Sequence, residues 1–561
     1  MLALTLLLLS LLSVTIAQSD SEGFQSYITL PDVWAPRFNI KNHSPERVSP
    51  GYWFVAPYGR VLPKNPVTGA QVFHTGPYIF DQDGTLIWAG SSMFKNLNAY
   101  DFKAVRLGDQ SPRLSLILAP SEDAPRGRAV VLNERYETEF EVSGAEDFEV
   151  FDIHEFKILP GGKTALACAH WTKEITLEDL GRPKEQSFFE AAGFYEFDIA
   201  SGQRLFWWDS SAPGNIALHE SVILDNSTMS EESPGHDYVH INSVDKNDNG
   251  DYLASMRFTN TIYLISGKDG SIKWRLGGHE TSFDQDFTFS KQHDARFLES
   301  NETHHIISFL NNASDDRGEF RELFPPKTAK VIHRYNRPDN KLSRLRGSAQ
   351  KLPNGNVFVS WSDNGYMSEF SSEGDNLMET QFMTTGFYNY RAYKYEIAGR
   401  PGYPPVVVAS ATGSEENDQS TTIYFSWNGA TDITSWNLYA QDRENQQPYL
   451  MANIKKTGFE TVHIAKGHID WVFVEALDQQ GTPLGRSGVS RTQWDTAGTE
   501  EKDPQSEIVS GIESPNDQTQ PKNNFMIFSS FVSLLGFLPN ASIIMGSDPF
   551  FFQELGLGLG V

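Results

Sequence analysis

Three histidines stand in short polar phrases that lead into apolar stretches, and imidazole is the side chain best suited to moving a chemical group near neutral pH. A neutral imidazole nitrogen is a good nucleophile and departs readily from an adduct. Each histidine alone is more typical of a hydrogen-bonded structural residue, but three in similar phrases indicate a shared site. They are His154 in Asp-Ile-His-Glu-Phe, His240 in Asp-Tyr-Val-His-Ile-Asn-Ser and His293 in Gln-His-Asp-Ala-Arg-Phe.

Other chemistries find little support in the sequence. The chain has no Gly-x-Ser-x-Gly elbow, P-loop, dinucleotide fingerprint or His-Glu-x-x-His motif. We therefore expect no cofactor. A ring of histidines can bind a transition metal, because neutral imidazole is a common ligand. No Cys or His-x-His pair accompanies these histidines, however, so we expect no metal site.

Short β-rich stretches recur along most of the chain and pair across tight, glycine-containing turns. Three such pairs are predicted to be hairpins that end in an aromatic residue, namely Tyr78–Trp88, Phe197–Trp208 and Tyr263–Trp274. Loose repetition of four-stranded units is typical of a β-propeller, and a series of unrelated β-sandwiches is the alternative. We predict an all-β chain with a propeller over residues 30–400.

The propeller hypothesis explains how residues far apart in sequence would form one site. The innermost strand of each blade lines a central channel, so matching positions in successive blades meet there. We therefore expect the three histidines to converge. The single cysteine, Cys168, lies in an apolar run and is predicted to be an unpaired core residue.

The pattern changes after a proline cluster that begins at Pro401. Residues 403–491 alternate as strands and resemble a fibronectin-III or immunoglobulin-like sandwich. Residues 492–524 are acidic and polar, which predicts a disordered linker, and residues 525–561 form an apolar tail. A helix over the uncharged part, 525–538, would be about 21 Å long, short of the roughly 30 Å hydrocarbon core. Membrane association through the tail is therefore the minority alternative.

The N-terminus and the sequons predict export. Residues 1–17 are mostly apolar and uncharged and end in small residues, which is typical of a cleaved signal peptide. We expect a secreted, extracellular or lumenal glycoprotein. The chain carries 46 Lys and Arg against 72 Asp and Glu, a net charge of −26, which repels phosphate backbones and argues against a nucleic-acid partner. The candidate glycosylation sites are Asn42, Asn226, Asn301 and Asn312.

Several phrases resemble the arylsulfotransferase (aryl-sulfate sulfotransferase) family, and more closely its eukaryotic, fungal-type secreted branch. The resemblance covers most of the chain up to Arg400. Its phrases are Ser49–Pro57, Asp152–Phe156, His240–Asp245, Trp274–Gly278, Gln292–Phe297 and Gln350–Asn356.

The resemblance implies a six-bladed propeller that moves a sulfuryl group between phenols through a covalent histidine adduct, without a nucleotide donor. His240 and His293 resemble the supporting histidines of the family, and Arg317 resembles its sulfate-binding arginine, so these three are the predicted catalytic residues. Charged donors of this kind stabilise sulfuryl oxygens and a departing phenolate. The predicted substrate-binding residues are His154, Asn242, Arg296, Gln350 and Arg391.

Two departures from the family pattern leave the mechanism open. Bacterial relatives take their nucleophilic histidine from a later blade, but Arg346–Gln350 and Asn389–Tyr393 contain none. Asn311 stands where the family usually has an aspartate. The nucleophile is therefore open among the three histidines named above. The expected ligands are small aryl sulfates or phenols, and the alternative function is a catalytically silent extracellular propeller that binds such ligands.

Overall fold

The computed structural model describes most of the chain between residues 23 and 494. The described ranges are 23–59, 71–108, 111–119, 127–142, 151–178, 181–222, 235–302, 304–312, 317–324, 328–415, 417–443 and 446–494. For 183, 185 and 317–324 the backbone alone is described. The predicted signal peptide, the linker beyond Trp494, the apolar tail and Asn226 lie outside these residues.

Strands make up nearly all of the regular structure, which confirms the all-β prediction. Within the described residues, helix is limited to single 3-10 turns: η1 (Pro45–Arg47), η3 (Leu218–Glu220) and η5 (Arg257–Thr259). The same part of the chain contains no helix long and apolar enough to cross a membrane.

Six sheets of four or five strands follow one another through the described residues up to Tyr395. The first contains β4 (Tyr52–Val55), β6 (Tyr78–Phe80), β7 (Leu86–Ala89) and β31 (Tyr393–Tyr395). The second contains β8 (Ala99–Val105), β9 (Arg113–Leu118), β10 (Arg128–Leu132) and β11 (Thr138–Val142). The third contains β12 (Phe156–Ile158), β13 (Thr164–Leu177), β14 (Arg182–Asp198), β15 (Arg204–Asp209) and β16 (His236–Asp237).

The next three sheets continue the series. The fourth contains β17 (Ile241–Lys246), β18 (Tyr252–Met256), β19 (Thr261–Ile265) and β20 (Ile272–Gly277). The fifth contains β21 (Asp284–Gln285), β22 (His293–Ser300), β23 (His305–Asn311), β24 (Arg317–Phe324) and β25 (Thr328–Asn336). The sixth contains β26 (Ser348–Lys351), β27 (Val357–Ser360), β28 (Met367–Phe370), β29 (Asn376–Phe382) and β3 (Phe38–Asn42).

The predicted hairpins are confirmed. The strand pairs β6–β7, β14–β15 and β19–β20 are antiparallel and joined by short turns. Strands β6, β7 and β19 are buried along their whole length, because each face of such a strand packs against a neighbouring element. Cys168 is unpaired and buried in β13, as expected, and burial raises the pKa of its thiol well above the usual value.

Strands from the two ends of this region close the series of sheets. β31 pairs with β4, with Tyr393 opposite Phe54, and β3 pairs with β29, with Phe38 opposite Phe382. Two further short pairs lie nearby: β1 (Phe24–Tyr27) with β2 (Leu30–Pro36), and β5 (Pro57–Tyr58) with β30 (Tyr388–Asn389). The beginning and the end of the region are thus held together by backbone hydrogen bonds.

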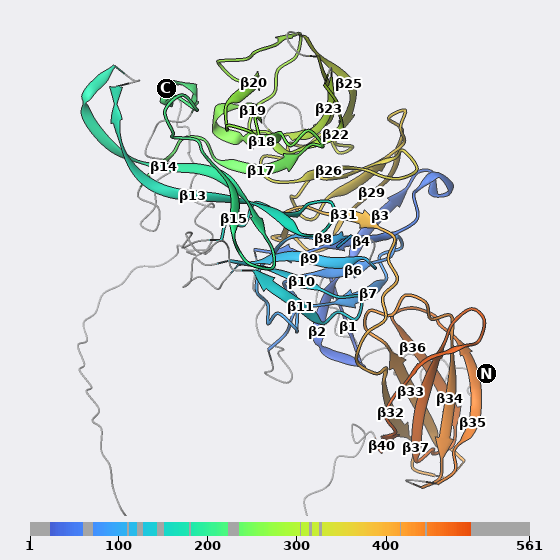
Figure 1. Cartoon of the computed structure of the whole chain (residues 1–561). Coiled ribbons are helices and arrows are strands. Elements are labelled where there is room, and N and C mark those ends of the chain that lie inside the picture. The colour runs from blue at the N-terminus through green and yellow to red at the C-terminus, as the bar shows by residue number, and fades with distance from the viewer. Residues whose placement is uncertain are drawn as a thin grey trace, which may run out of the picture.

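The leading strands of neighbouring sheets are joined through side chains. The amide of Ala295 in β22 donates to Ser243 Oγ in β17 at 2.9 Å, and Ser348 Oγ in β26 donates to the carbonyl of Ala392 at 3.0 Å. The strands that follow the histidine phrases therefore lie side by side. β13 and β14 run on as a long hairpin that projects beyond the other sheets (Figure 1).

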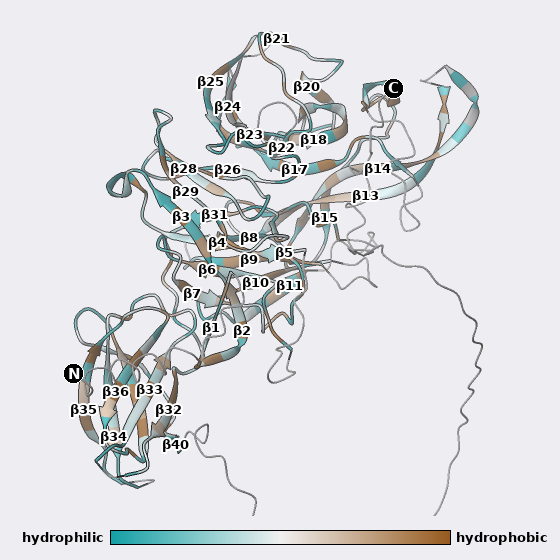
Figure 2. Ribbon diagram, turned by 180° about the vertical axis from the view of Figure 1, so that it is seen from behind, coloured by the Kyte–Doolittle hydropathy of each residue, from teal (hydrophilic) through white to brown (hydrophobic). Residues whose placement is uncertain are grey.

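The C-terminal part forms two further sheets that share one core. One contains β32 (Val406–Thr412), β33 (Ser420–Ser426), β36 (Glu460–Lys466) and β40 (Gln493–Trp494). The other contains β34 (Ser435–Gln441), β35 (Tyr449–Lys455), β37 (Trp471–Leu477), β38 (Pro483–Arg486) and β39 (Ser490–Arg491). Trp436 is buried between them, and hydrophobic segments alternate with hydrophilic ones along these strands (Figure 2).

Specific contacts join the C-terminal sheets to the first and second sheets. Tyr136 stacks on Trp88 with ring centroids 4.9 Å apart, and its hydroxyl donates to the carbonyl of Gly429 at 2.8 Å. Gly429 has φ +97°, and a Cβ there would lie 2.5 Å from the Tyr136 ring. Glycine is therefore required at this junction.

Candidate active site

The structure brings together the three predicted histidines. His154 and His240 immediately precede the third and fourth sheets, at the approach to β12 and β17, and His293 is the first residue of β22. The rings of His154 and His240 meet edge to face with centroids 4.9 Å apart. This convergence is the central geometric feature of the site.

His154 and His240 are each oriented by an aspartate that precedes them in the chain. Nδ1 of His154 lies 2.8 Å from Oδ1 of Asp152, and Nδ1 of His240 lies 2.6 Å from Oδ2 of Asp237. Each aspartate also accepts the backbone amide of its histidine, at 2.7 and 2.9 Å. A carboxylate accepts, so Nδ1 carries the proton, and the lone pair of the neutral ring is at Nε2. Both histidines are thus oriented to act through Nε2.

The side chains of His154 and His240 are about equally exposed, at 12% and 13%. Among the described residues, none is hydrogen-bonded to Nε2 of His154. The backbone of His240 is left-handed, with φ +50°, which sets its ring against that of His154.

A fourth histidine, His170 in β13, belongs to the same cluster and was not predicted. Its Nδ1 lies 2.8 Å from Oδ2 of Asp152, and its Nε2 lies 3.6 Å from Glu190 in β14. Burial alone would lower the pKa of His170, but these carboxylates raise it to about 9. Burial likewise opposes ionisation of Asp152, yet His154 and His170 hold its pKa well below the usual range.

His293 has a different environment that makes it a poor nucleophile. Its Nδ1 donates to the carbonyl of Gly347 at 2.8 Å, so Nε2 accepts from the hydroxyl of Tyr390 at 3.1 Å. Both nitrogens are thereby used. Burial, and then the charge of Arg391, hold the pKa of His293 well below its usual value, so the ring stays neutral. Gly347 fits here because its φ is +91° and a Cβ would lie 2.5 Å from the carbonyl of Ser360.

Tyr390 links His293 to the other histidines, and it too was missed in the sequence. Its ring lies 6.0 Å from that of His154, and its hydroxyl lies 3.3 Å from the His154 carbonyl. It lies in the late phrase Asn389–Tyr393, the position at which bacterial relatives carry their nucleophilic histidine. Burial raises the pKa of this phenol well above 10, although Arg391 opposes the shift. Tyr390 is therefore a neutral hydrogen-bond donor.

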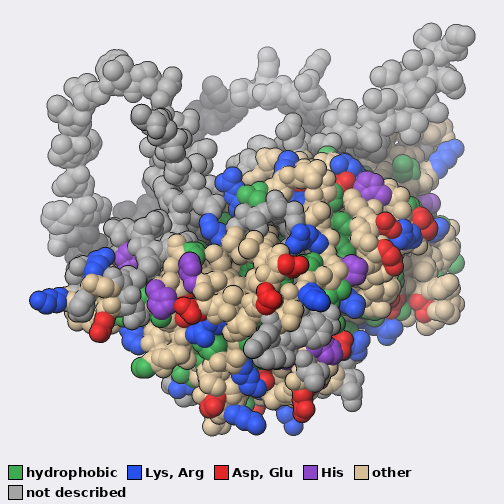
Figure 3. Space-filling model, turned by 90° about the horizontal axis from the view of Figure 1, so that it is seen from above, with side chains coloured by type: hydrophobic (Ala, Val, Ile, Leu, Met, Phe, Trp, Pro, Cys, Tyr) green, Lys and Arg blue, Asp and Glu red, His purple; other side chains and the backbone are tan. Residues whose placement is uncertain are grey.

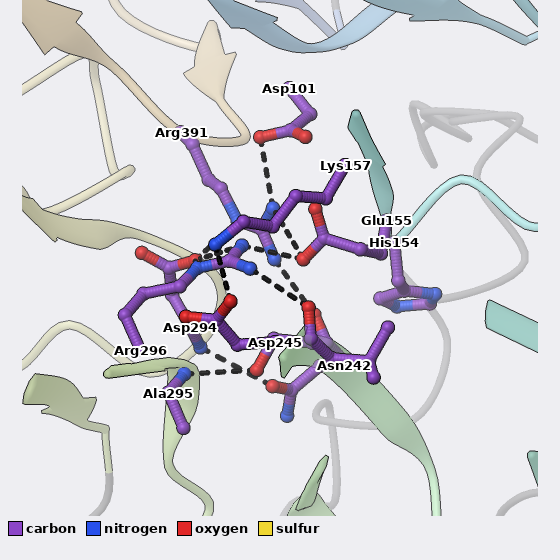
Figure 4. A network of polar contacts seen from close by, with 12 residues as sticks. Asp101, His154, Glu155, Lys157, Asn242, Asp245, Asp294, Ala295, Arg296 and Arg391 are labelled. Carbon is purple, nitrogen blue, oxygen red and sulfur yellow. Dashed lines mark hydrogen bonds and ion pairs between the residues drawn. The ribbon is translucent and has the colours of Figure 1, made fainter. Parts of the chain in front are cut away.

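A buried ionic network lies beside the histidines (Figure 4). Arg391 contacts Asp101 at 2.9 Å, Asp294 at 3.3 Å and Glu155 at 3.5 Å. Arg296 contacts Glu155 at 2.5 Å and Asp294 at 2.6 Å. Burial disfavours the charge of both guanidinium groups, but the surrounding carboxylates raise their pKa well above the usual value.

This network includes Arg296 and Arg391, two of the predicted substrate-binding residues. Their guanidinium groups contact carboxylates and backbone carbonyls, and Arg391 is completely buried. Asn242 is also buried, and its side chain binds the carbonyl of Gln292 and the amide of Asp294. Gln350 pairs through its amide with both backbone groups of Lys394. The contacts of these four residues position the leading strands, and their substrate-binding roles stay predictions.

The remaining predicted site residues are Arg317 and the sequon asparagines, and the structure describes them only in part. Arg317 begins β24 opposite Asn311, but its side chain is outside the description. Asn42 and Asn301 are exposed. Asn312 is buried, and its Nδ2 donates to the carbonyls of Ser343 and Arg346 at 2.8 and 3.0 Å. In the folded chain the nitrogen that would carry a glycan on Asn312 is already engaged, and glycosylation at this residue stays a prediction.

Other features of the described residues lie away from this site. No group of three or more His, Cys, Asp or Glu among them is placed to hold a metal ion. A hollow of about 420 Å³ lies against β25, lined by residues 286–287 and 331–334, and includes none of the clustered histidines. The face seen in Figure 3 carries histidine side chains among acidic and basic ones.

The comparison with protein families bears directly on this cluster. Residues 126–383 match the family model described as arylsulfotransferase (ASST). The match supports the arylsulfotransferase family. The matched stretch contains His154, His170, His240 and His293, and it ends before Tyr390.

Comparisons with whole proteins add little to the family match. No curated protein matches the chain significantly. A crystal structure of a protein of unknown function from Bacteroides caccae is 12% identical and covers 62% of this chain and all of that one, with a TM-score of 0.34. Hydrazine synthase from Kuenenia stuttgartiensis is 7% identical and covers 52% of this chain and 63% of that one, with a TM-score of 0.20. These scores are too low to support an argument.

Proposed function

We propose that this chain is an arylsulfotransferase that moves a sulfuryl group from an aryl sulfate to a phenol through a histidine adduct. The observation that carries the proposal is the pair of imidazole rings, 4.9 Å apart, each held at Nδ1 by its own aspartate. The family match over the same residues supports the reaction class. Two such rings supply both a nucleophile and a proton donor.

The proposed architecture is a six-bladed propeller of the secreted, fungal-type branch, with the C-terminal sheets as a supporting sandwich. Six successive sheets, closed by β31 on β4, support the blade assignment. The apolar residues 1–17 support export into the extracellular space or the secretory lumen, with attachment through the tail as the alternative. Fractionating cells with an alkaline carbonate wash tests this, because recovery of the full-length chain only in the washed pellet contradicts a soluble secreted protein.

The activity is tested with 4-nitrophenyl sulfate as donor and a simple phenol as acceptor. We expect nitrophenol release and the appearance of the sulfated acceptor. His240→Ala should lower the rate by about 100-fold or more, the usual effect of losing a positioned acid or base. If the intact protein releases no more nitrophenol than His240→Ala, the proposal fails.

A second candidate is a silent propeller that binds aryl sulfates or phenols. It is favoured by one observation, the presence of Tyr390 in the late phrase where a histidine was sought. This candidate predicts that the ligands raise the melting temperature through linkage without turnover. Turnover at any pH would exclude it.

A further inference from the structure

Arg346 stands two residues before β26 of the sixth sheet, and its guanidinium lies over two tyrosine rings. The guanidinium carbon is 5.2 Å from the centroid of the Tyr58 ring and 5.1 Å from that of the Tyr388 ring. The two rings lie 6.1 Å apart across the β5–β30 pair. Because a cation is attracted to the face of an aromatic ring, the two rings define where this positive charge is held.

The backbone at Arg346 is left-handed and is held from two sides. Its φ is +65°, and Gly347, which follows, has φ +91°. The Arg346 carbonyl accepts from Nδ2 of Asn312 at 3.0 Å, and the amide of Gly347 donates to the carbonyl of Tyr390 at 2.9 Å. A residue with a Cβ rarely adopts this conformation, and positions that do so cluster at active sites and ligand-binding segments.

The same segment is bonded directly to the histidine site. The Gly347 carbonyl is the group that accepts from Nδ1 of His293 at 2.8 Å. Neighbouring rings also connect Arg346 to the paired imidazoles, with centroids 5.0 Å apart for Tyr58 and Tyr100, 5.6 Å for Tyr100 and Tyr390, and 6.0 Å for Tyr390 and His154. Arg346 therefore precedes its leading strand beside the site, as the two paired histidines precede theirs.

Exposure separates the groups that a ligand can reach from those that support them. The partly exposed groups are Arg346, Tyr388, His154 and His240. The buried ones are Tyr58, Tyr100, His293 and Tyr390. The buried rings thus form a support that joins one accessible cation to two accessible imidazoles.

The chemistry of this arrangement suits an oxyanion on an aromatic ring. The tyrosine rings contact the face of the guanidinium, whereas its N–H donors lie in its plane, where they match two oxygens of a sulfate, sulfonate or carboxylate. A guanidinium also keeps its charge at any pH at which proteins are folded, which an imidazole does not. The accessible part of the Tyr388 ring lies beside this charge, and aromatic rings pack favourably in offset or edge-to-face arrangements.

We propose that Arg346 binds the anionic group of an aryl substrate, with the Tyr388 ring against the substrate ring. The inference rests on the proposed function and adds a binding residue to it, since the donor of that reaction is an aryl oxyanion. A phenol that carries a carboxylate presents the same chemistry from the acceptor side, and the experiments below distinguish the two sources.

The first experiment measures binding without turnover. The probe is toluene-4-sulfonate, an aryl oxyanion that has no sulfuryl group to transfer, and toluene-4-sulfonamide is its neutral match. Titration calorimetry on the intact full-length protein should show the sulfonate binding about tenfold more tightly or better, because hydrogen bonds to charged groups are the strong ones. Arg346→Met keeps an unbranched side chain on the rings but removes the charge, so it should lose this preference. Arg346→Lys keeps the charge without the planar fork and should retain part of it.

The matched control is Arg486→Met. Arg486 lies in β38, and its guanidinium carbon is 3.7 Å from the centroid of the Phe473 ring, so this variant removes another stacked cation, in the C-terminal sheets. It should leave the sulfonate affinity unchanged, and urea midpoints establish that both variants are folded. Absence of the preference in the intact protein, its survival in folded Arg346→Met, or an equal loss in Arg486→Met overturns the proposal.

The second experiment assigns the anion to the donor or to the acceptor. With 4-nitrophenyl sulfate as donor and phenol as acceptor, Arg346→Met should lower kcat/KM for the donor by about tenfold and leave that for phenol unchanged. A loss confined to 4-hydroxybenzoate as acceptor supports the binding role of Arg346 but places the acceptor carboxylate there. Unchanged values for all three substrates overturn the proposal. Absence of turnover in the intact protein contradicts the transferase function, whereas the calorimetric preference for the sulfonate still decides the role of Arg346.

Discussion

Asp101 and Arg391 form an ion pair of 2.9 Å although 290 positions separate them in the chain, and both side chains are at most 1% exposed. The pair joins β8 of the second sheet to the segment that leads into β31. Glu155, just before β12 of the third sheet, and Asp294, in β22 of the fifth, contact the same guanidinium. One arginine therefore holds segments of several sheets around a common point.

Removal of this arginine should destabilise the fold strongly. Arg391→Ala leaves three carboxylates buried beside one another with less compensation, and breaking a buried charge network typically costs about 3–5 kcal/mol. Urea denaturation followed by tryptophan fluorescence measures the loss. Arg400→Ala is the matched control, because Arg400 is 72% exposed and its pair with Asp432 is 3.4 Å long. It should change the free energy of unfolding by less than about 0.5 kcal/mol.

The network also shows what the sequence could predict and what it could not. The histidine sites could be predicted because each histidine and its aspartate are close in the sequence. Asp152 precedes His154 by two residues, and Asp237 precedes His240 by three. The contacts of Arg296 and Arg391 join segments far apart in sequence, and residue type alone suggested a role in binding anions. A basic residue looks the same in sequence whether it faces a ligand or buried carboxylates.

Tyr390 gives a test of the hydrogen bond to His293. Tyr390→Phe keeps the ring contacts but removes the hydroxyl that lies 3.1 Å from Nε2 of His293. The loss of one buried hydrogen bond should cost about 1 kcal/mol of stability. Sulfuryl transfer should slow by up to about tenfold, because the same hydroxyl also lies 3.3 Å from the carbonyl of His154. Steady-state kinetics and urea denaturation measure the two effects. Tyr439→Phe on β34, whose hydroxyl lies 3.4 Å from Glu475, should leave kcat unchanged, and an equal loss there would contradict this interpretation.

His293 should make the fold sensitive to mild acid. Its pKa is lowered in the folded chain, so below the ordinary value of 6.5 the unfolded chain binds a proton that the folded chain excludes. Its contribution to stability is therefore present above pH 6.5 and is lost as the pH falls below that value.

Comparing urea midpoints at pH 7.5 and 5.5 measures the loss. His293→Gln keeps one donor and one acceptor but does not titrate there, so its midpoint should fall less than that of the intact protein. A fall of the same size would contradict the prediction, and His463→Gln on β36 is the control.

The fold was easier to predict than the site. Hairpins such as Tyr78–Trp88 could be predicted because two short apolar runs flank a polar turn with glycine, and the structure has strands β6 and β7 there. The long extension of β13 and β14 was not predicted, because its outer part is polar and has no core to impose a period. His170 lies on that extension, 18 residues from Asp152, so no local pattern connected them.

The last prediction is that a sequon is glycosylated only where the folded chain exposes its asparagine. Asn42 and Asn312 both stand in sequons, but Asn42 is exposed on the edge strand β3, whereas Asn312 is buried with Nδ2 bound to two carbonyls. Transfer of a glycan needs a free amide nitrogen on an accessible segment. Glycopeptide mass spectrometry of protein secreted from a eukaryotic host should therefore find glycan on Asn42 and none on Asn312.

Asn42→Gln should lower the mass by one glycan with little change in stability. Asn312→Gln should leave the glycan mass unchanged but destabilise the chain by about 1–3 kcal/mol, because two buried carbonyls lose their donor. Glycan found on Asn312 in folded protein would show that glycosylation precedes formation of these hydrogen bonds and that the segment after β23 takes a different arrangement.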